Sequence, residues 1–192
     1  MPGSLGGRRI LMIIAPRDFR DEELFVPRGR FEGEGATVEV ASTEPGHAHG
    51  MLGAEVAPDL LVGDAEASRY AAVVLVGGRG APDALWEHGG VHAVLRAAAR
   101  RGSTLGAICL APVALARAGL LAGVRATVYG DPRAKKEMVR GGALFIDDDV
   151  VVDRTVVTAS GPDAARAFAD AVIRVMRGGA VAPPVAASRG RR

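Results

Sequence analysis

Residues 103–116 read STLGAICLAPVALA and contain Cys109, the single cysteine of the chain. The apolar run before Cys109 is typical of a buried strand, and the pattern after it is typical of a helix. A nucleophilic side chain at such a strand-to-helix turn is the sequence form of a nucleophile elbow. We expect the turn to hold the sulfur near the first backbone N–H groups of the helix, which favours the thiolate over the thiol. Many free cysteines are instead small buried hydrophobes, so the local pattern leaves both interpretations open.

The rest of the chain alternates between apolar segments that predict buried strands and amphipathic segments that predict helices. Residues 132–140 predict a short helix whose N-cap is Asp131, with a proline in its first position. We predict further helices at 21–33, 91–101 and 162–177. We predict strands at 9–15, 37–41, 70–76, 103–108, 126–128, 149–153 and 155–159. This alternation predicts right-handed βαβ units, hence an α/β fold with a mostly parallel central sheet between helices.

The predicted topology also indicates where a site would form. In parallel sheets, ligands bind in the crevice beyond the carboxyl ends of the strands. Three segments should converge there: residues 15–23, residues 77–82 and the turn at Cys109. This convergence favours a functional thiol over an inert one.

Length and composition predict one domain with a large core, because the chain has 192 residues of which 48% are hydrophobic. We predict a single domain at 9–177, with flexible segments at 1–8 and 178–192. A single cysteine excludes an intramolecular disulfide and fits a reducing, cytoplasmic location. The apolar run at 10–15 is too short for a signal sequence or a membrane span, so no membrane association is predicted.

Charge and histidine content predict neither nucleic acid nor metal as a partner. The formal charge of +2 becomes −1 without the three terminal arginines at 189, 191 and 192, and aromatic residues make up only 4%. His47 and His49 lie in a glycine-rich loop, and the pair Gly89-Gly90 separates His88 from His92. We therefore expect surface histidines and no metal site.

Several motifs in the same order and spacing resemble the DJ-1/PfpI (ThiJ) superfamily over about residues 9–176. They are GAIC at 106–109, EELFVP at 22–27, VGGRGAP at 76–82, GGA at 141–143 and TASGP at 158–162. The resemblance implies a flavodoxin-like three-layer α/β sandwich with the elbow cysteine as its reactive residue. It also implies a homodimer or a higher homo-oligomer.

The resemblance further implies which residues surround the cysteine. In the family, a glutamate four residues before the proline of the first helix hydrogen-bonds the cysteine sulfur, and this position is Glu23. The family's oxyanion pocket uses backbone N–H groups that correspond here to Gly78 and Leu110. Gly77 and Tyr129 are further pocket candidates. Without the resemblance, the sequence favours Glu23 as a solvated charge in the first turn of a helix.

The activity that the resemblance implies is cysteine chemistry on small reactive aldehydes or their glycated adducts, as in glyoxalase III or a deglycase, with no cofactor. One alternative is a redox-sensing or chaperone-like protein whose Cys109 is oxidised. In the protease-like and many glyoxalase-like branches of the family a histidine stands where this chain has Leu110, whereas the DJ-1-like branch lacks it and relies on the cysteine and the glutamate. A peptidase or amidase is therefore less favoured.

Overall fold

The computed structural model describes residues 4–178, and a seven-stranded sheet forms the centre of this part of the chain. The strand order is β11-β12-β8-β7-β1-β3-β6, and β11 is the one strand that runs antiparallel to its neighbour. The strands are β1 (Arg9–Ile14), β3 (Thr37–Ser42), β6 (Leu60–Leu61), β7 (Ala72–Leu75), β8 (Thr104–Ile108), β11 (Val150–Asp153) and β12 (Val156–Ala159). The predicted α/β fold with a mostly parallel sheet is confirmed.

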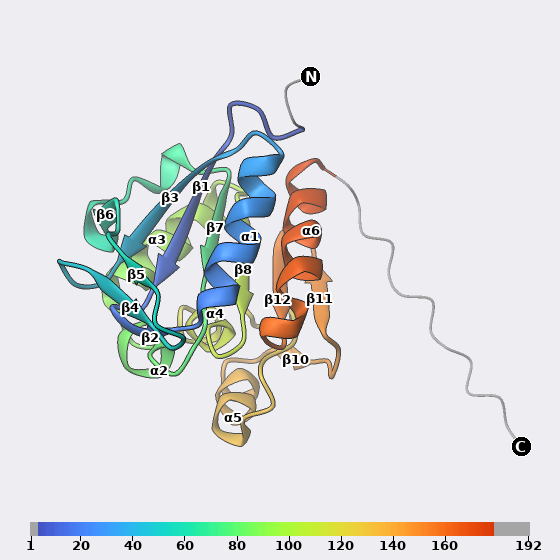
Figure 1. Cartoon of the computed structure of the whole chain (residues 1–192). Coiled ribbons are helices and arrows are strands. Elements are labelled where there is room, and N and C mark those ends of the chain that lie inside the picture. The colour runs from blue at the N-terminus through green and yellow to red at the C-terminus, as the bar shows by residue number, and fades with distance from the viewer. Residues whose placement is uncertain (1–3, 179–192) are drawn as a thin grey trace, which may run out of the picture.

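Helices cover both faces of this sheet (Figure 1). α1 (Asp21–Gly33) and α6 (Ala165–Met176) lie side by side on one face, and α3 (Gly89–Arg100) and α4 (Pro112–Arg117) cover the other. Shorter elements complete the described chain: α2 (Ala81–Ala84), α5 (Pro132–Arg140), β2 (Arg17–Phe19), β4 (Ala48–Gly50), β5 (Glu55–Val56), β9 (Arg125–Ala126), β10 (Leu144–Phe145), and the 3₁₀ turns Val62–Asp64, Ala67–Arg69 and Pro162–Ala164.

Apart from Arg9 and Thr104 at their first positions, the central strands β1, β7 and β8 carry no polar side chain, because both of their faces are covered. In β1, Leu11 and Ile13 join the core beneath α3 and α4, whereas Ile10, Met12 and Ile14 join the core beneath α1 and α6. All five side chains are fully buried. Alternation of side chains along a strand divides the apolar run between the two cores, which explains why β1 lacks the polar positions of a half-exposed strand.

Local capping fixes the predicted helix at 132–140. The Asp131 side chain accepts a hydrogen bond of 2.7 Å from the N–H of Ala134, and Pro132 occupies the first helical position. This satisfies one of the free amides at the start of α5. The bounds of α5 are those predicted from the sequence. None of the helices described for residues 4–178 is both long and apolar enough to cross a bilayer.

The start of the described chain differs from the prediction of a flexible segment at 1–8. Leu5 is fully buried, and its N–H donates to the carbonyl of Glu34 at 2.8 Å. The N–H of Arg8 in turn donates to the Leu5 carbonyl at 3.0 Å. Residues 4–8 therefore belong to the domain, because the buried Leu5 side chain and its backbone bond to Glu34 hold them against the end of α1. The predicted tail at 178–192 lies outside the described residues except for Gly178.

We predict that Leu5→Ala lowers the free energy of unfolding by about 2–5 kcal/mol, since it leaves a cavity in the core beneath α1 and α6. Leu52→Ala is the matched control, because the Leu52 side chain is 61% exposed and its loss should cost little. Denaturant titration of both variants measures the difference. Equal stability of the two variants would show that the segment contributes nothing to the fold.

Candidate active site

Cys109 lies in a strained turn directly after β8. Its φ is +63°, a left-handed conformation that is rare for any residue other than glycine. The Cys109 N–H donates to the carbonyl of Ala159 at 2.9 Å, and its carbonyl accepts from the N–H of Tyr129 at 2.9 Å. Both backbone bonds tie the turn to neighbouring segments and so maintain the strained conformation. The elbow predicted from the sequence is therefore present, with the cysteine side chain only 7% exposed.

Glu23 approaches this cysteine from the first turn of α1. Its carboxyl is fully buried, which rules out the reading as a solvated helix charge. Oε2 accepts a hydrogen bond of 2.9 Å from the N–H of Gly77, and the carboxyl interacts with the Cys109 side chain. Oε1 is buried without a well-aligned hydrogen bond from any described residue. A buried carboxylate oxygen left in this state is costly, and protonation of the carboxyl removes much of that cost.

The loop after β7 brings two glycines against both side chains. A Cβ on Gly77 would lie 2.6 Å from the Cβ of Cys109 and 2.7 Å from Oε2 of Glu23, so this position has no room for a larger residue. Gly78 has a φ of +109°, and a Cβ there would lie 2.5 Å from the backbone nitrogen of Arg20. Glycine at both positions permits the backbone to approach the sulfur closely.

The backbone amides of Gly78 and Leu110 act on the Cys109 sulfur and favour its thiolate. These are the positions that the resemblance assigned to an oxyanion pocket. The structure thus brings together Cys109, Glu23 and the amides of Gly77, Gly78 and Leu110, from three segments of the chain. The three segments follow the carboxyl ends of β1, β7 and β8.

Burial alters the acidity of both side chains. Loss of hydration raises the pKa of Glu23 to about 7. The hydrogen bonds of its carboxyl to Cys109 and Gly77 lower this pKa, but by less than burial raises it. Loss of hydration, together with the adjacent carboxylate charge, raises the pKa of Cys109 to about 12, although the Gly78 and Leu110 amides oppose this. Each group thus retains a proton more strongly than it would in water.

This result corrects the prediction that the elbow alone favours the thiolate. α4 begins three residues after Cys109, at Pro112, and burial beside a carboxylate outweighs the pull of the two amides. The sulfur is a thiol whenever Glu23 is ionised. A thiolate at neutral pH requires that the proton sit on the carboxyl instead, so the ionisation of the two side chains must be treated as that of a pair.

Other candidate residues lie at the edge of this site or away from it. The Tyr129 ring is 49% exposed and lies beside Gly161, so its link to Cys109 is through the backbone. His88 caps α3 by accepting from the Val91 N–H, and His47 pairs with Glu55. His92 is buried with Nε2 2.7 Å from the Trp86 carbonyl, so the prediction of a surface histidine is wrong there.

Sequence reasoning missed two polar residues that shape the site. Arg20 precedes α1, and its positive charge lowers the pKa of Glu23 while its guanidinium pairs with Glu22 at 2.8 Å. Asp21 is buried and accepts from the N–H groups of Leu52 and Ala54, both at 2.9 Å. The charge pattern at 20–23 could have indicated the Arg20–Glu22 pair, but nothing local indicates the contact of Asp21 with residues 52–54. Within residues 4–178, no three His, Cys, Asp or Glu side chains are grouped to hold a metal ion.

A family model agrees with this arrangement. The model of the DJ-1/PfpI family matches residues 8–175, which is most of the chain. The chain belongs to the DJ-1/PfpI family. The match includes the turn at Cys109, the glycine loop at 77–78 and α1. All the segments that form the site therefore lie within the matched residues.

Three relatives show how far this likeness extends. An uncharacterized protein of Methanocaldococcus jannaschii is 43% identical over 168 residues, covering 88% of this chain and 82% of the relative. A deglycase of Pyrococcus horikoshii is 32% identical over 152 residues, covering 79% and 90% of the two chains. A glutathione-independent glyoxalase of Caenorhabditis elegans is 29% identical over 170 residues, covering 88% of each.

A solved structure confirms the fold. The ThiJ/PfpI domain protein of Brachyspira murdochii superimposes with a TM-score of 0.85 at 30% identity, covering 90% of this chain and 99% of that one. The likeness therefore extends over the whole domain and is not confined to the segments around Cys109.

The raised pKa of Glu23 predicts a pH-dependent stability difference between the wild type and Glu23→Gln. The pKa of Glu23 is about 7 in the folded protein and has its ordinary value of 4.5 in the unfolded chain. The stabilising contribution of this group is therefore fully present below about pH 4.5 and is lost as the pH rises through about 7. The glutamine variant should therefore gain about 3 kcal/mol relative to the wild type between pH 4.5 and 8. Denaturant titrations of both proteins across this range measure the difference. A difference that is constant with pH would contradict a buried, protonated carboxyl.

Proposed function

We propose that this protein is a cysteine-dependent enzyme that acts on small reactive aldehydes or on the adducts they form with amines. In this proposal Cys109 is the nucleophile and Glu23 is the acid and base. The observation that carries it is the fully buried Glu23 carboxyl in contact with the side chain of a strained elbow cysteine. The deglycase and glyoxalase named among the relatives support the same substrate class.

The reactive form is the pair with a single proton. With pKa values of about 7 and about 12, the Glu23–Cys109 pair carries one proton at and above neutral pH. When that proton sits on Glu23, the sulfur is a thiolate that accepts hydrogen bonds from the carboxyl and from the Gly78 and Leu110 amides. The unpaired Oε1 of Glu23 favours this arrangement, because a protonated carboxyl has an O–H to donate.

Addition to an aldehyde such as methylglyoxal then follows directly. The thiolate forms a C–S bond with the aldehyde carbon, the C=O π bond breaks, and the resulting alkoxide takes the proton from Glu23 to give a hemithioacetal. The Gly78 and Leu110 amides lie beside the sulfur, close to where the alkoxide charge develops.

Glu23, now a carboxylate, next removes the proton from the former aldehyde carbon and returns it to the adjacent ketone carbon, while the hydroxyl proton of the hemithioacetal moves to the ketone oxygen. The first carbon is thereby oxidised to a thioester and the second is reduced to an alcohol, with no external electron acceptor. Water then cleaves the thioester, which releases lactate and restores the thiol. For a glycated amine that carries a carbinolamine, Glu23 would protonate the nitrogen as the C–N bond breaks and the hydroxyl loses its proton, which releases the repaired amine and restores the aldehyde for the same addition.

A redox-sensing role for Cys109 is the second candidate. The two amides that face the sulfur could also bind the oxygens of a sulfinate, and the adjacent carboxyl could donate to one of them. A peptidase or amidase is less favoured, because three of the four histidines are held by other partners and Leu110 follows the cysteine. A homodimer or higher homo-oligomer remains a prediction from the family resemblance.

We predict that Cys109→Ser and Glu23→Gln each lower the rate of lactate formation from methylglyoxal by roughly a hundredfold or more. Arg174→Gln is the control, because Arg174 is an exposed residue in the last turn of α6 and should leave the rate unchanged. Lactate is assayed with the circular dichroism spectrum of each variant recorded alongside to check folding.

Equal rates for the wild type and Cys109→Ser would contradict the enzymatic proposal. Mass spectrometry after mild peroxide treatment then distinguishes the second candidate. Stepwise addition of one and then two oxygen atoms to Cys109, with no aldehyde turnover, would favour the sensor.

A further inference from the structure

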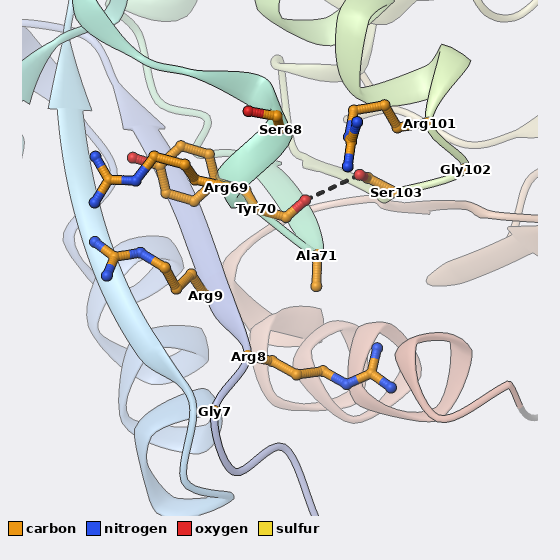
Figure 2. A pocket seen from close by; sticks show the side chains of 10 residues that line it. All are labelled: Gly7, Arg8, Arg9, Ser68, Arg69, Tyr70, Ala71, Arg101, Gly102 and Ser103. Carbon is orange, nitrogen blue, oxygen red and sulfur yellow. Dashed lines mark hydrogen bonds between the residues drawn. The ribbon is translucent and has the colours of Figure 1, made fainter.

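A cavity lies at the end of the central sheet opposite to Cys109, where β1, β7 and β8 begin. Its volume is about 390 Å³, and its walls come from the segments just before these strands (Figure 2). β1 has six residues at about 3.3 Å each, so the cavity and the Cys109 site are separated by roughly 20 Å. The cavity is therefore not part of the site described above.

The cavity is strongly positive. Four arginines line it, Arg8, Arg9, Arg69 and Arg101, and no acidic side chain does. In Figure 2, Arg9 and Arg69 extend toward one side of the cavity beside Tyr70, while Arg8 and Arg101 lie on the other side. We call this the arginine cavity. Four cations around one space repel one another unless an anion is present between them.

Only one of the four positive charges is neutralised within residues 4–178. Arg9 Nη2 bonds Glu39 Oε1 at 2.6 Å, and the other carboxylate oxygen of Glu39 accepts the Tyr70 hydroxyl at 2.6 Å. The side chains of Arg8, Arg69 and Arg101 make no hydrogen bond or ion pair with any described residue. Three of the four guanidinium groups, all on exposed residues, therefore have no hydrogen-bond or ion-pair partner among the described residues.

The walls are held in place by their own backbone bonds. The N–H groups of Tyr70, Ala71, Gly102 and Ser103 all donate to backbone carbonyls, and the Ser103 hydroxyl donates to the Tyr70 carbonyl at 2.9 Å. Backbone donors at these positions are thus already used. The guanidinium groups remain as the donors for a ligand, and they stand on a wall that needs no rearrangement to receive one.

Guanidinium groups are suited to one ligand chemistry in particular. Their planar N–H forks match the paired oxygens of phosphate, and several of them together favour a ligand with more than one negative charge. The volume lies within the range of small-molecule sites, and the charged lining disfavours an apolar ligand. We propose that the arginine cavity binds a small molecule that carries phosphate groups with two or more negative charges.

Isothermal titration calorimetry with inorganic pyrophosphate tests this proposal on the full chain. We expect one site per chain, with affinity that falls as salt concentration rises. Arg69→Gln combined with Arg101→Gln should weaken binding by at least about tenfold. The control removes two positive charges elsewhere, by Lys136→Gln combined with Arg166→Gln, both at exposed positions, and should bind pyrophosphate like the wild type.

Three results would overturn the proposal: no heat of binding in the wild type at low salt, equal weakening in both double variants, or tight binding of a short single-stranded oligonucleotide without binding of pyrophosphate. The last would indicate nucleic acid as the ligand. Thermal unfolding without ligand checks that the variants fold, and Arg8→Gln alone provides a second, milder test. Because pyrophosphate binding is measured without any aldehyde, its result is independent of the proposed activity of Cys109.

Discussion

The contact between the Glu23 carboxyl and the Cys109 sulfur is the interaction on which the rest of the site depends. Two acids that would each ionise separately in water are buried together, and burial raises the pKa of both. The two side chains therefore compete for a single proton above neutral pH. The amides of Gly77, Gly78 and Leu110 then influence where the single remaining proton sits, because one of them stabilises the carboxylate and two stabilise the thiolate.

The fold could be predicted from the sequence wherever a segment carries its own structural signal. β1 and β8 are continuous apolar runs, and α5 has a capping aspartate and a proline at its start, so local chemistry alone fixes these elements. The segment at 4–8 carries no such signal. Its single apolar side chain, Leu5, stands among glycine and arginine, and its burial depends on a surface formed by α1 far along the chain.

The candidate site could be predicted only in part. The elbow has a local pattern, but a glutamate in the first turn of a helix looks the same whether it is solvated or buried, so Glu23 was identified through the family resemblance. The arginine cavity has no pattern in the sequence at all. Its four arginines come from three segments that the parallel topology brings to one end of the sheet, and only the three-dimensional structure shows that, among residues 4–178, Glu39 is the one acid that pairs with any of them.

The most direct measurement of the shared proton is the ultraviolet absorbance of the thiolate as a function of pH, in the wild type and in Glu23→Gln, with Cys109→Ser as the blank. The account predicts that the wild-type thiolate appears only well above neutral pH, because burial and the Glu23 carboxylate both raise the pKa of Cys109. In Glu23→Gln the negative charge beside the sulfur is gone, so the midpoint should fall, although burial keeps it above that of a cysteine in water. The same midpoint in both proteins would contradict a proton shared between Glu23 and Cys109.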